Sequence, residues 1–218
     1  MTEVIADREP RTGYVDVNGE TMLAIGRLTV GNTGAKSSGW WGMWLLVISE
    51  AALFAYLLFS YYYFAVQFGR EWLPDQLLPF TYSIPGTCAL LVGAATMFMA
   101  TIAIRRNRQL LAMLGILVAF AGGAIYIWLQ FAEWYQEPFV LSSSSYSSIY
   151  FVMTGFDTAH IFVGTVMLLF LAIWTGLGYF DHVRTTAISA IAIYWYFVNL
   201  AWLGVFFTLY ITPHLGLG

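Results

Sequence analysis

Three ionisable side chains lie within long apolar stretches of this sequence: Glu50, Asp157 and His160. Ionisable groups inside a membrane span are costly, and they commonly mark proton relays, ion pathways or ligand sites. A carboxyl group beside an imidazole can relay or buffer protons. It can also act as a polar staple between two helices, worth about 1 kcal/mol. The residues alone leave both interpretations open.

The positions of Glu50 and His160 along their segments allow the two side chains to meet. Glu50 lies ten residues beyond Trp40, where the first apolar segment begins. His160 lies eleven residues beyond Ile149, where the fourth begins. At 1.5 Å per residue, both lie about 15 Å into a hydrocarbon core that is about 30 Å thick. We therefore expect a Glu50–His160 contact if these helices are neighbours, with Asp157 one turn away on the same face.

Other residue types restrict the chemistry of the chain. The single cysteine, Cys88, rules out an intramolecular disulfide, a CxxC pair and a thiolate metal cluster. Of the three histidines, only His160 lies inside an apolar segment, so we expect no metal or redox cofactor in this chain and no catalytic residue. The secondary polar candidates are Glu133, Asn199 and Tyr196.

The elements that must position these residues are membrane spans. The chain of 218 residues is 60% hydrophobic and 10% charged, which excludes a disordered protein, a nucleic-acid binder and an ordinary soluble enzyme. Five segments have the length and composition of a transmembrane helix, and only Glu50 and Asp157 are charged within them. The predicted spans are 40–66, 83–104, 110–132, 149–177 and 186–211. The sequence predicts an all-α integral membrane bundle of five transmembrane helices.

The chain divides into a polar arm, residues 1–39, and a membrane domain, residues 40–218. The arm and the connections on its side of the membrane carry eight of the nine Lys and Arg residues. Basic residues favour the cytoplasmic side, so we expect a cytoplasmic N-terminus and an extracytoplasmic C-terminus. The expected location is the inner (plasma) membrane of a bacterium.

Four motifs resemble a known family. They are Ser-Glu-x-x-x-Phe at 49–54, Gln-x-x-Glu-Trp-Tyr at 130–135, Gly-Phe-Asp-Thr-Ala-His at 155–160 and Tyr-Trp-Tyr-Phe-Val-Asn at 194–199. Together, in this order and spacing, they resemble subunit III of haem–copper terminal oxidases of the cytochrome c oxidase type, in its five-helix form. The resemblance covers roughly residues 40–211.

The resemblance implies a function as well as a fold. It implies a non-redox accessory subunit of a respiratory oxidase that passes electrons from cytochrome c to O2 and moves protons. Such a subunit stabilises catalytic subunit I, binds phospholipid and supports proton uptake. Subunits I and II would be its partners and would hold the haem and copper. Glu50 matches the family's buried carboxyl group in the helix beside subunit I.

Four positions depart from the family pattern. Asp157 replaces a histidine, Tyr196 and Asn199 replace a histidine and an acid, and Ser189 stands where the family often has glutamate. These departures keep open a companion subunit of a quinol oxidase or nitric-oxide reductase. Two other classes are a small transporter or channel, and a membrane enzyme such as an intramembrane hydrolase. A transporter would need more pore-lining polar groups and broken helices. A hydrolase would need a nucleophile paired with His160.

Overall fold

A computed structural model describes residues 14–17, 20–23, 38–74, 77–106, 108–177 and 186–215. The chain divides into two units, Met1–Ser38 and Gly39–Gly218. In the first unit, β1 (Tyr14–Val17) and β2 (Glu20–Leu23) form an antiparallel hairpin in which Tyr14 pairs with Leu23. The hairpin lies in the segment expected to be a polar arm, and the rest of residues 1–37 lie outside the described residues.

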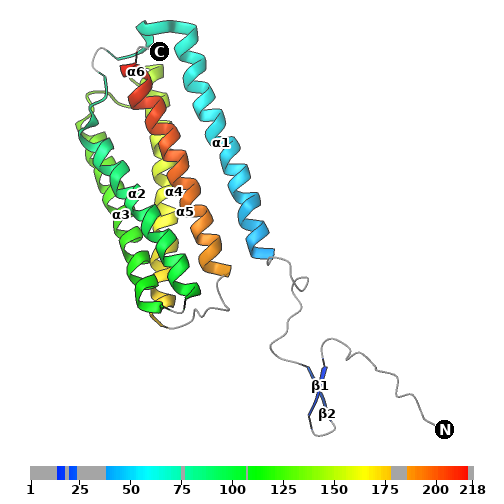
Figure 1. The fold of residues 1–218 in the computed structure, drawn as a ribbon. Helices are drawn as coiled ribbons and strands as arrows, with labels where there is room; N and C mark the ends of the chain where they lie inside the picture. The colour runs from blue at the N-terminus through cyan, green and yellow to red at the C-terminus, as the bar shows by residue number, and fades with distance from the viewer. Residues whose placement is uncertain are drawn as a thin grey trace, which may run out of the picture. The chain divides into compact units, whose positions relative to one another are not determined.

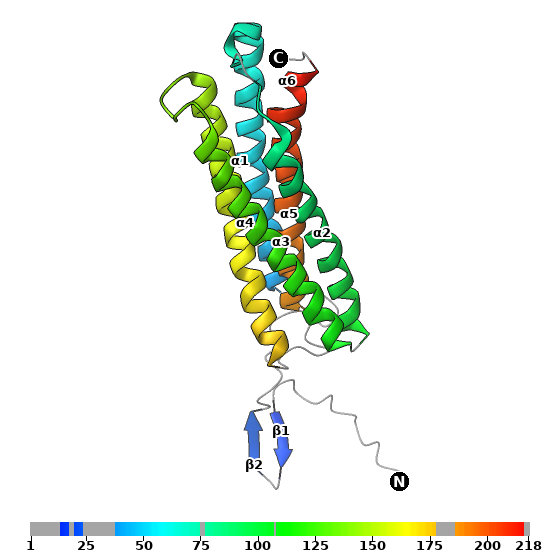
Figure 2. The same cartoon turned by 90° about the vertical axis from the view of Figure 1, so that its left-hand side faces the viewer.

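The second unit is a bundle of five long helices, each long and apolar enough to cross a membrane (Figures 1 and 2). This confirms the predicted fold class. The helices are α1 (Ser38–Phe68), α2 (Phe80–Arg105), α3 (Gln109–Gln136), α4 (Ser145–Gly176) and α5 (Thr186–Phe206). Shorter elements are the 3₁₀-helix η1 (Gly69–Trp72), the π-helix η2 (Phe207–Ile211) and α6 (Thr212–His214), which continues from η2.

Most helices extend beyond the apolar segments that predicted them, because local hydrogen bonds continue the helix into polar sequence. The clearest case is α4, which begins at Ser145 and not at Ile149. The Ser144 side chain accepts a hydrogen bond from the Ser147 amide, and the Ser147 hydroxyl faces the Ser144 amide in return. This capping box satisfies backbone groups that the first turn would otherwise leave unpaired.

Four of the helices pack into one body in which α2 lies against α3 and α5, while α4 lies between α3 and α5. Small residues allow α2 and α3 to approach closely. A Cβ atom added to Gly122 would lie 2.6 Å from the Ala89 carbonyl oxygen, and one added to Gly115 would lie 2.7 Å from that of Thr96. Since both neighbours are backbone atoms, only glycine fits at these two positions without a shift of the helices.

Helix α1 is the least buried of the five helices. It contacts the rest of the bundle mainly through side chains, including the Phe54 ring, which packs on His160 of α4 and Phe197 of α5. Many of its large apolar side chains are exposed: Trp41, Leu45, Ile48, Tyr56, Phe59, Tyr63 and Val66. The outer face of α1 therefore has the composition of a surface covered by lipid or by another membrane subunit.

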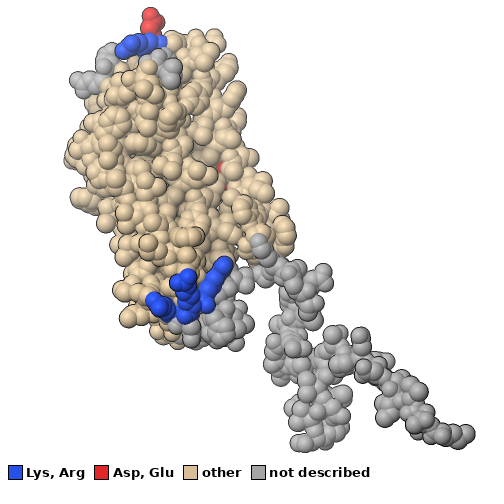
Figure 3. Space-filling model, viewed as in Figure 1, with Lys and Arg blue, Asp and Glu red and all other residues tan. Residues whose placement is uncertain are grey.

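The described charged residues lie mainly at the two ends of the bundle (Figure 3). Arg105, Arg106 and Arg108 lie where α2 ends and α3 begins. Arg70 and Glu71 lie in η1 at the opposite end. The flank between the ends is almost free of charge in this view, as the hydrocarbon layer of a membrane requires.

Candidate functional site

Glu50 of α1 and His160 of α4 form a direct pair, as their depths predicted. Their Oε2 and Nε2 atoms are 2.9 Å apart. The other ring nitrogen of His160, Nδ1, donates a hydrogen bond to the Phe156 carbonyl oxygen at 2.7 Å. Because a carbonyl oxygen can only accept, Nδ1 carries a hydrogen. One further proton is shared between Nε2 and Oε2, so the pair is either a neutral acid with imidazole or a carboxylate with imidazolium.

The pair opens on an apolar hollow of about 270 Å³. The Glu50 side chain is 30% exposed and that of His160 15% exposed, so neither is sealed inside the bundle. The Phe54 ring meets the imidazole edge to face at 5.1 Å, and the Tyr194 hydroxyl donates to the His160 carbonyl oxygen at 3.3 Å. The lining residues are Leu46, Glu50, Ala159, His160, Val163, Met167 and Tyr194.

Asp157 lies on α4 but faces a different helix from His160. It is fully buried, and its Oδ2 atom lies 3.1 Å from the Tyr126 hydroxyl of α3. Among the described residues, its side-chain hydrogen bond is to α3, whereas that of His160 is to α1. The structure therefore separates Asp157 from the Glu50–His160 pair with which the sequence analysis grouped it.

Glu133, a secondary candidate in the sequence analysis, is buried near the end of α3. Its Oε1 atom accepts a hydrogen bond from the Tyr210 hydroxyl at 2.7 Å, and its Oε2 atom accepts one from Gln130 Nε2 at 3.4 Å. Glu133 also borders a cavity of about 500 Å³ at this end of the bundle. The cavity is lined by Pro74, Leu77, Pro79, Tyr82, Glu133, Gln136, Glu137, Pro138 and Phe139.

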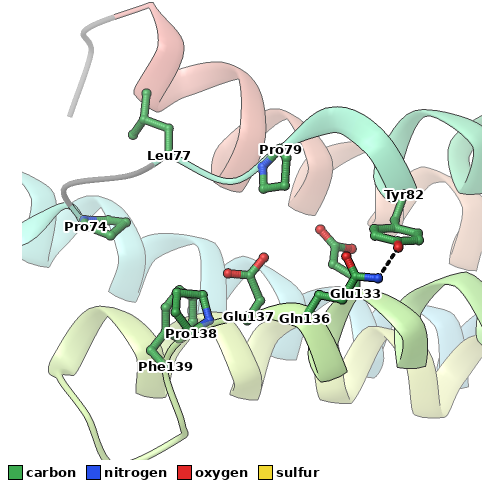
Figure 4. Close-up of a pocket in the computed structure, with 9 residues that line it drawn as sticks. All are labelled: Pro74, Leu77, Pro79, Tyr82, Glu133, Gln136, Glu137, Pro138 and Phe139. Carbon is green, nitrogen blue, oxygen red and sulfur yellow. Dashed lines mark hydrogen bonds between the residues drawn. The ribbon is translucent and has the colours of Figure 1, made fainter.

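Two carboxyl groups lie beside this cavity (Figure 4). Glu137 follows the last residue of α3, and partial burial raises the pKa of its carboxyl group. The side-chain amide of Gln136 donates a hydrogen bond from Nε2 to the Tyr82 hydroxyl and thereby joins α3 to α2. Two proline rings, Pro74 and Pro79, lie on the other side of the open space, so acidic and apolar groups share the lining.

The other two secondary candidates stand apart from these groups. Asn199 of α5 is buried and donates from Nδ2 to the Trp195 carbonyl oxygen of its own helix at 2.8 Å. Tyr196 lines a second hollow of about 280 Å³ beside α1, together with Trp44 and Phe197. Neither shares a described hydrogen bond with Glu50, Asp157 or Glu133.

Sequence reasoning missed Tyr126 and Tyr210, whose hydroxyl groups form hydrogen bonds with the buried acids Asp157 and Glu133, respectively. Tyr126 has a detectable signal, because residues 126, 130 and 133 follow the helical i, i+4, i+7 spacing and so lie on one face of α3. Tyr210 gave no such signal, since its direction depends on the π-helical turn η2.

The described residues contain no group of three or more His, Cys, Asp and Glu side chains that could hold a metal ion. Of the remaining histidines, His214 donates from Nδ1 to the Tyr210 carbonyl oxygen at 2.6 Å, and His182 lies outside the described residues. Fold and site together define a class: a multi-pass membrane bundle whose buried polar groups lie between helices.

Comparison with known proteins identifies the family. The sequence profile described as "Cytochrome c oxidase subunit III" matches residues 18–213, and the chain belongs to this family. Cytochrome c oxidase subunit 3 of Drosophila melanogaster is 28% identical over 177 residues, covering 78% of this chain and 68% of that protein. The subunits 3 of Locusta migratoria and Arabidopsis thaliana are each 29% identical over 177 residues, covering 78% of this chain and 67% of theirs.

Family membership makes the chain an oxidase accessory subunit and a multi-pass membrane protein that belongs to a complex with other subunits. It confirms the resemblance drawn from the four sequence motifs. The relatives named here are cytochrome c oxidase subunits 3 of animals and of a plant.

Proposed function

We propose that this chain stabilises the catalytic subunit of a respiratory haem–copper oxidase, holds lipid beside Glu50 and His160, and supports proton uptake during turnover. The oxidase would transfer electrons from cytochrome c to O2, with haem and copper in partner subunits. The observation that carries the proposal is the Glu50–His160 pair, a one-proton site between α1 and α4 that opens on an apolar hollow.

Support for a partner subunit comes from α1. Its outer face is apolar and largely uncovered, while Glu50 on its inner side is tied to α4. A catalytic subunit packed against α1 would bury this face. The pair would then lie one helix thickness from the partner, close enough for its protonation state to influence that interface electrostatically.

Support for lipid comes from the depth and lining of the hollow. Glu50 lies twelve residues beyond the start of α1, which corresponds to about 18 Å along the helix and to the middle of the bilayer. Lipids contribute acyl chains at this depth and not head groups. The apolar side chains of Leu46, Val163 and Met167 line the hollow and give it the apolar wall that an acyl chain requires.

The proposed orientation places the α2–α3 connection in the cytoplasm and the α3–α4 connection outside. The support is the cluster Arg105, Arg106 and Arg108 at one end of the bundle, against Arg70 alone in the described residues of the other. We place the complex in the plasma membrane of a bacterium.

Two substitutions of Glu50 test this function and distinguish a proton role from a purely structural one. Glu50→Gln keeps the size of the side chain and can still donate to His160 Nε2, but it cannot ionise. Glu50→Ala removes both properties. The complex is purified through a tag on the full chain, and its subunit stoichiometry and its loss of activity during sustained turnover are measured.

If the pair supports proton uptake, both variants should lose activity during turnover several-fold faster than the wild type. If it is only a staple, Glu50→Ala should weaken assembly while Glu50→Gln behaves as wild type. Ser49→Ala is the matched control, because among the described residues the Ser49 hydroxyl bonds only the Leu46 carbonyl oxygen of its own helix. Unchanged stoichiometry and unchanged turnover in Glu50→Ala would contradict the proposal.

A further inference from the structure

A second polar group runs through the bundle on the other side of α4. Asp157 Oδ2 lies 3.1 Å from the Tyr126 hydroxyl, which lies 3.1 Å from Gln130 Oε1. Gln130 Nε2 lies 3.4 Å from Glu133 Oε2, and the Tyr210 hydroxyl lies 2.7 Å from Glu133 Oε1. We call these five side chains the Asp157 chain. It leads from a fully buried acid to the cavity that Glu133 borders.

The hydrogens available to the Asp157 chain limit its protonation. The Tyr126 hydroxyl has one hydrogen but contacts two oxygens, Gln130 Oε1 and Asp157 Oδ2. An amide oxygen can only accept, so Tyr126 donates to Gln130. The contact to Asp157 then carries a hydrogen only if Asp157 is protonated and donates to the Tyr126 oxygen.

The other end of the Asp157 chain has the opposite arrangement. With Gln130 in this orientation, its amide nitrogen donates to Glu133, and Tyr210 donates to the second carboxyl oxygen. Both oxygens of Glu133 accept, as an ionised carboxylate requires. Reversing the Gln130 amide would reverse the assignment, with the proton on Glu133 and the charge on Asp157. Each pattern contains one proton and one negative charge.

We propose that the Asp157 chain binds a single proton, held by Asp157, while Glu133 is its ionised partner at the cavity. Burial favours this assignment over the reversed one. Asp157 is fully enclosed by apolar helices, where an unpaired charge is costly, whereas Glu133 has two donors and lies beside an open space. The site thus takes a proton as its ligand and presents a negative charge to the cavity.

Among the described residues around Asp157 and Glu133, no cation is present that would stabilise a second ionised carboxylate. The titratable groups near the two carboxyls on the neighbouring elements are Tyr126 of α3, Tyr146 and Tyr150 of α4, Tyr194 of α5, Tyr210 of η2, and Glu137, which follows α3. Tyrosines donate hydrogen bonds but supply no positive charge. Two carboxylates in this environment would therefore lack compensation, which also favours one retained proton.

The Asp157 chain is separate from the Glu50–His160 pair and does not depend on the function proposed for that pair. Among the described residues, no hydrogen bond links the two groups. A complex in which Glu50 proves dispensable for turnover could still hold this proton.

Infrared spectroscopy tests the assignment, because a protonated carboxyl group absorbs at a frequency distinct from that of a carboxylate. The full chain is purified with its complex in lipid nanodiscs at neutral pH, and variant spectra are subtracted from that of the wild type. Asp157→Asn should remove one carboxylic acid band. Glu133→Gln and the control Glu50→Gln should retain that band. Tyr126→Phe should retain the band but shift its frequency, because Asp157 loses the acceptor of its hydrogen bond.

The possible outcomes are distinct. Loss of the band only in Glu133→Gln would place the proton on Glu133 and not on Asp157. Loss of a separate band in each of Glu133→Gln and Asp157→Asn would show two protons, and loss in neither would show none. An unchanged band frequency in Tyr126→Phe would mean that the hydrogen bond is absent. Each of these four results would overturn the proposal. Unchanged haem content and subunit stoichiometry verify that every variant is folded.

Discussion

At the scale of single residues, the Phe156 carbonyl oxygen determines what the Glu50–His160 pair can do. It accepts a hydrogen bond from Nδ1 of His160, which leaves Nε2 facing Glu50. The imidazole is thereby fixed in orientation by its own helix, and only one proton remains between the two residues. A pair fixed in this way changes its charge distribution by moving a proton, without rotation of the ring.

The pH dependence of stability offers a test at the residue scale. Burial raises the pKa of Glu137 above its value in an unfolded chain. The folded state therefore binds the proton more tightly, and the stabilisation is present at low pH and lost as pH rises through the raised pKa. We expect the thermal unfolding midpoint of the wild type to fall over this range and that of Glu137→Gln to fall less.

The measurement is a series of thermal unfolding curves of the detergent-solubilised complex between mildly acidic and neutral pH. Glu71→Gln serves as the control, because Glu71 is an exposed acid at the same end of the bundle. An identical pH dependence in the wild type and Glu137→Gln would show that this carboxyl group does not contribute.

Sequence reasoning could predict the meeting of Glu50 and His160 but not the partner of Asp157. Depth alone determines whether two residues on neighbouring helices can meet, and depth follows from counting residues. The partner depends on direction around the helix axis. Three residues correspond to about 300°, so Asp157 and His160 differ by about 60° in direction. That difference is enough for one to face α3 and the other α1, since α4 contacts both helices.

At the scale of elements, the close approach of α2 and α3 depends on glycine. Gly122→Ala would place a methyl group 2.6 Å from the Ala89 carbonyl oxygen, so the two helices would have to move apart. We expect a loss of about 1–3 kcal/mol of stability, as for other overpacked sites. Thermal unfolding of the purified complex measures the effect.

Gly155→Ala is the matched control on α4, because nothing lies within 4 Å of the added methyl group. Alanine has the higher helix propensity, so this change should leave stability unchanged or raise it by up to about 1 kcal/mol. Equal stability of the Gly122→Ala and Gly155→Ala variants would show that the α2–α3 interface tolerates expansion.

Sequence predicted the number and approximate position of the helices, but not all of their ends or the N-terminal hairpin. Apolar length locates a span, whereas an end depends on local groups such as the Ser144 cap. The hairpin has a sequence signal of its own, because Asn-Gly at 18–19 is typical of two-residue hairpin connections. Both omissions concern polar sequence outside the apolar segments.

At the scale of the whole molecule, the charges at the two ends of the bundle predict the membrane orientation proposed above. A cysteine at position 143, in the exposed α3–α4 connection, should react with a membrane-impermeant maleimide in intact spheroplasts. A cysteine at position 106 should react only after lysis. The two variants, Ser143→Cys and Arg106→Cys, are made in a Cys88→Ala background. The opposite labelling pattern would place the N-terminus outside the cell.

The π-helical turn η2 affects the end of the molecule that holds the cavity. The Thr212 amide donates to the Phe207 carbonyl oxygen five residues back. In an α-helix this hydrogen bond joins residues four apart, so the turn contains one extra residue. Each residue of an α-helix advances the chain by about 100° around its axis. Loss of one residue between Phe207 and Tyr210 would therefore turn Tyr210 away from Glu133 and leave that carboxylate with one donor. The length of the chain at this turn, and not only the identity of its side chains, is part of what positions the buried acid.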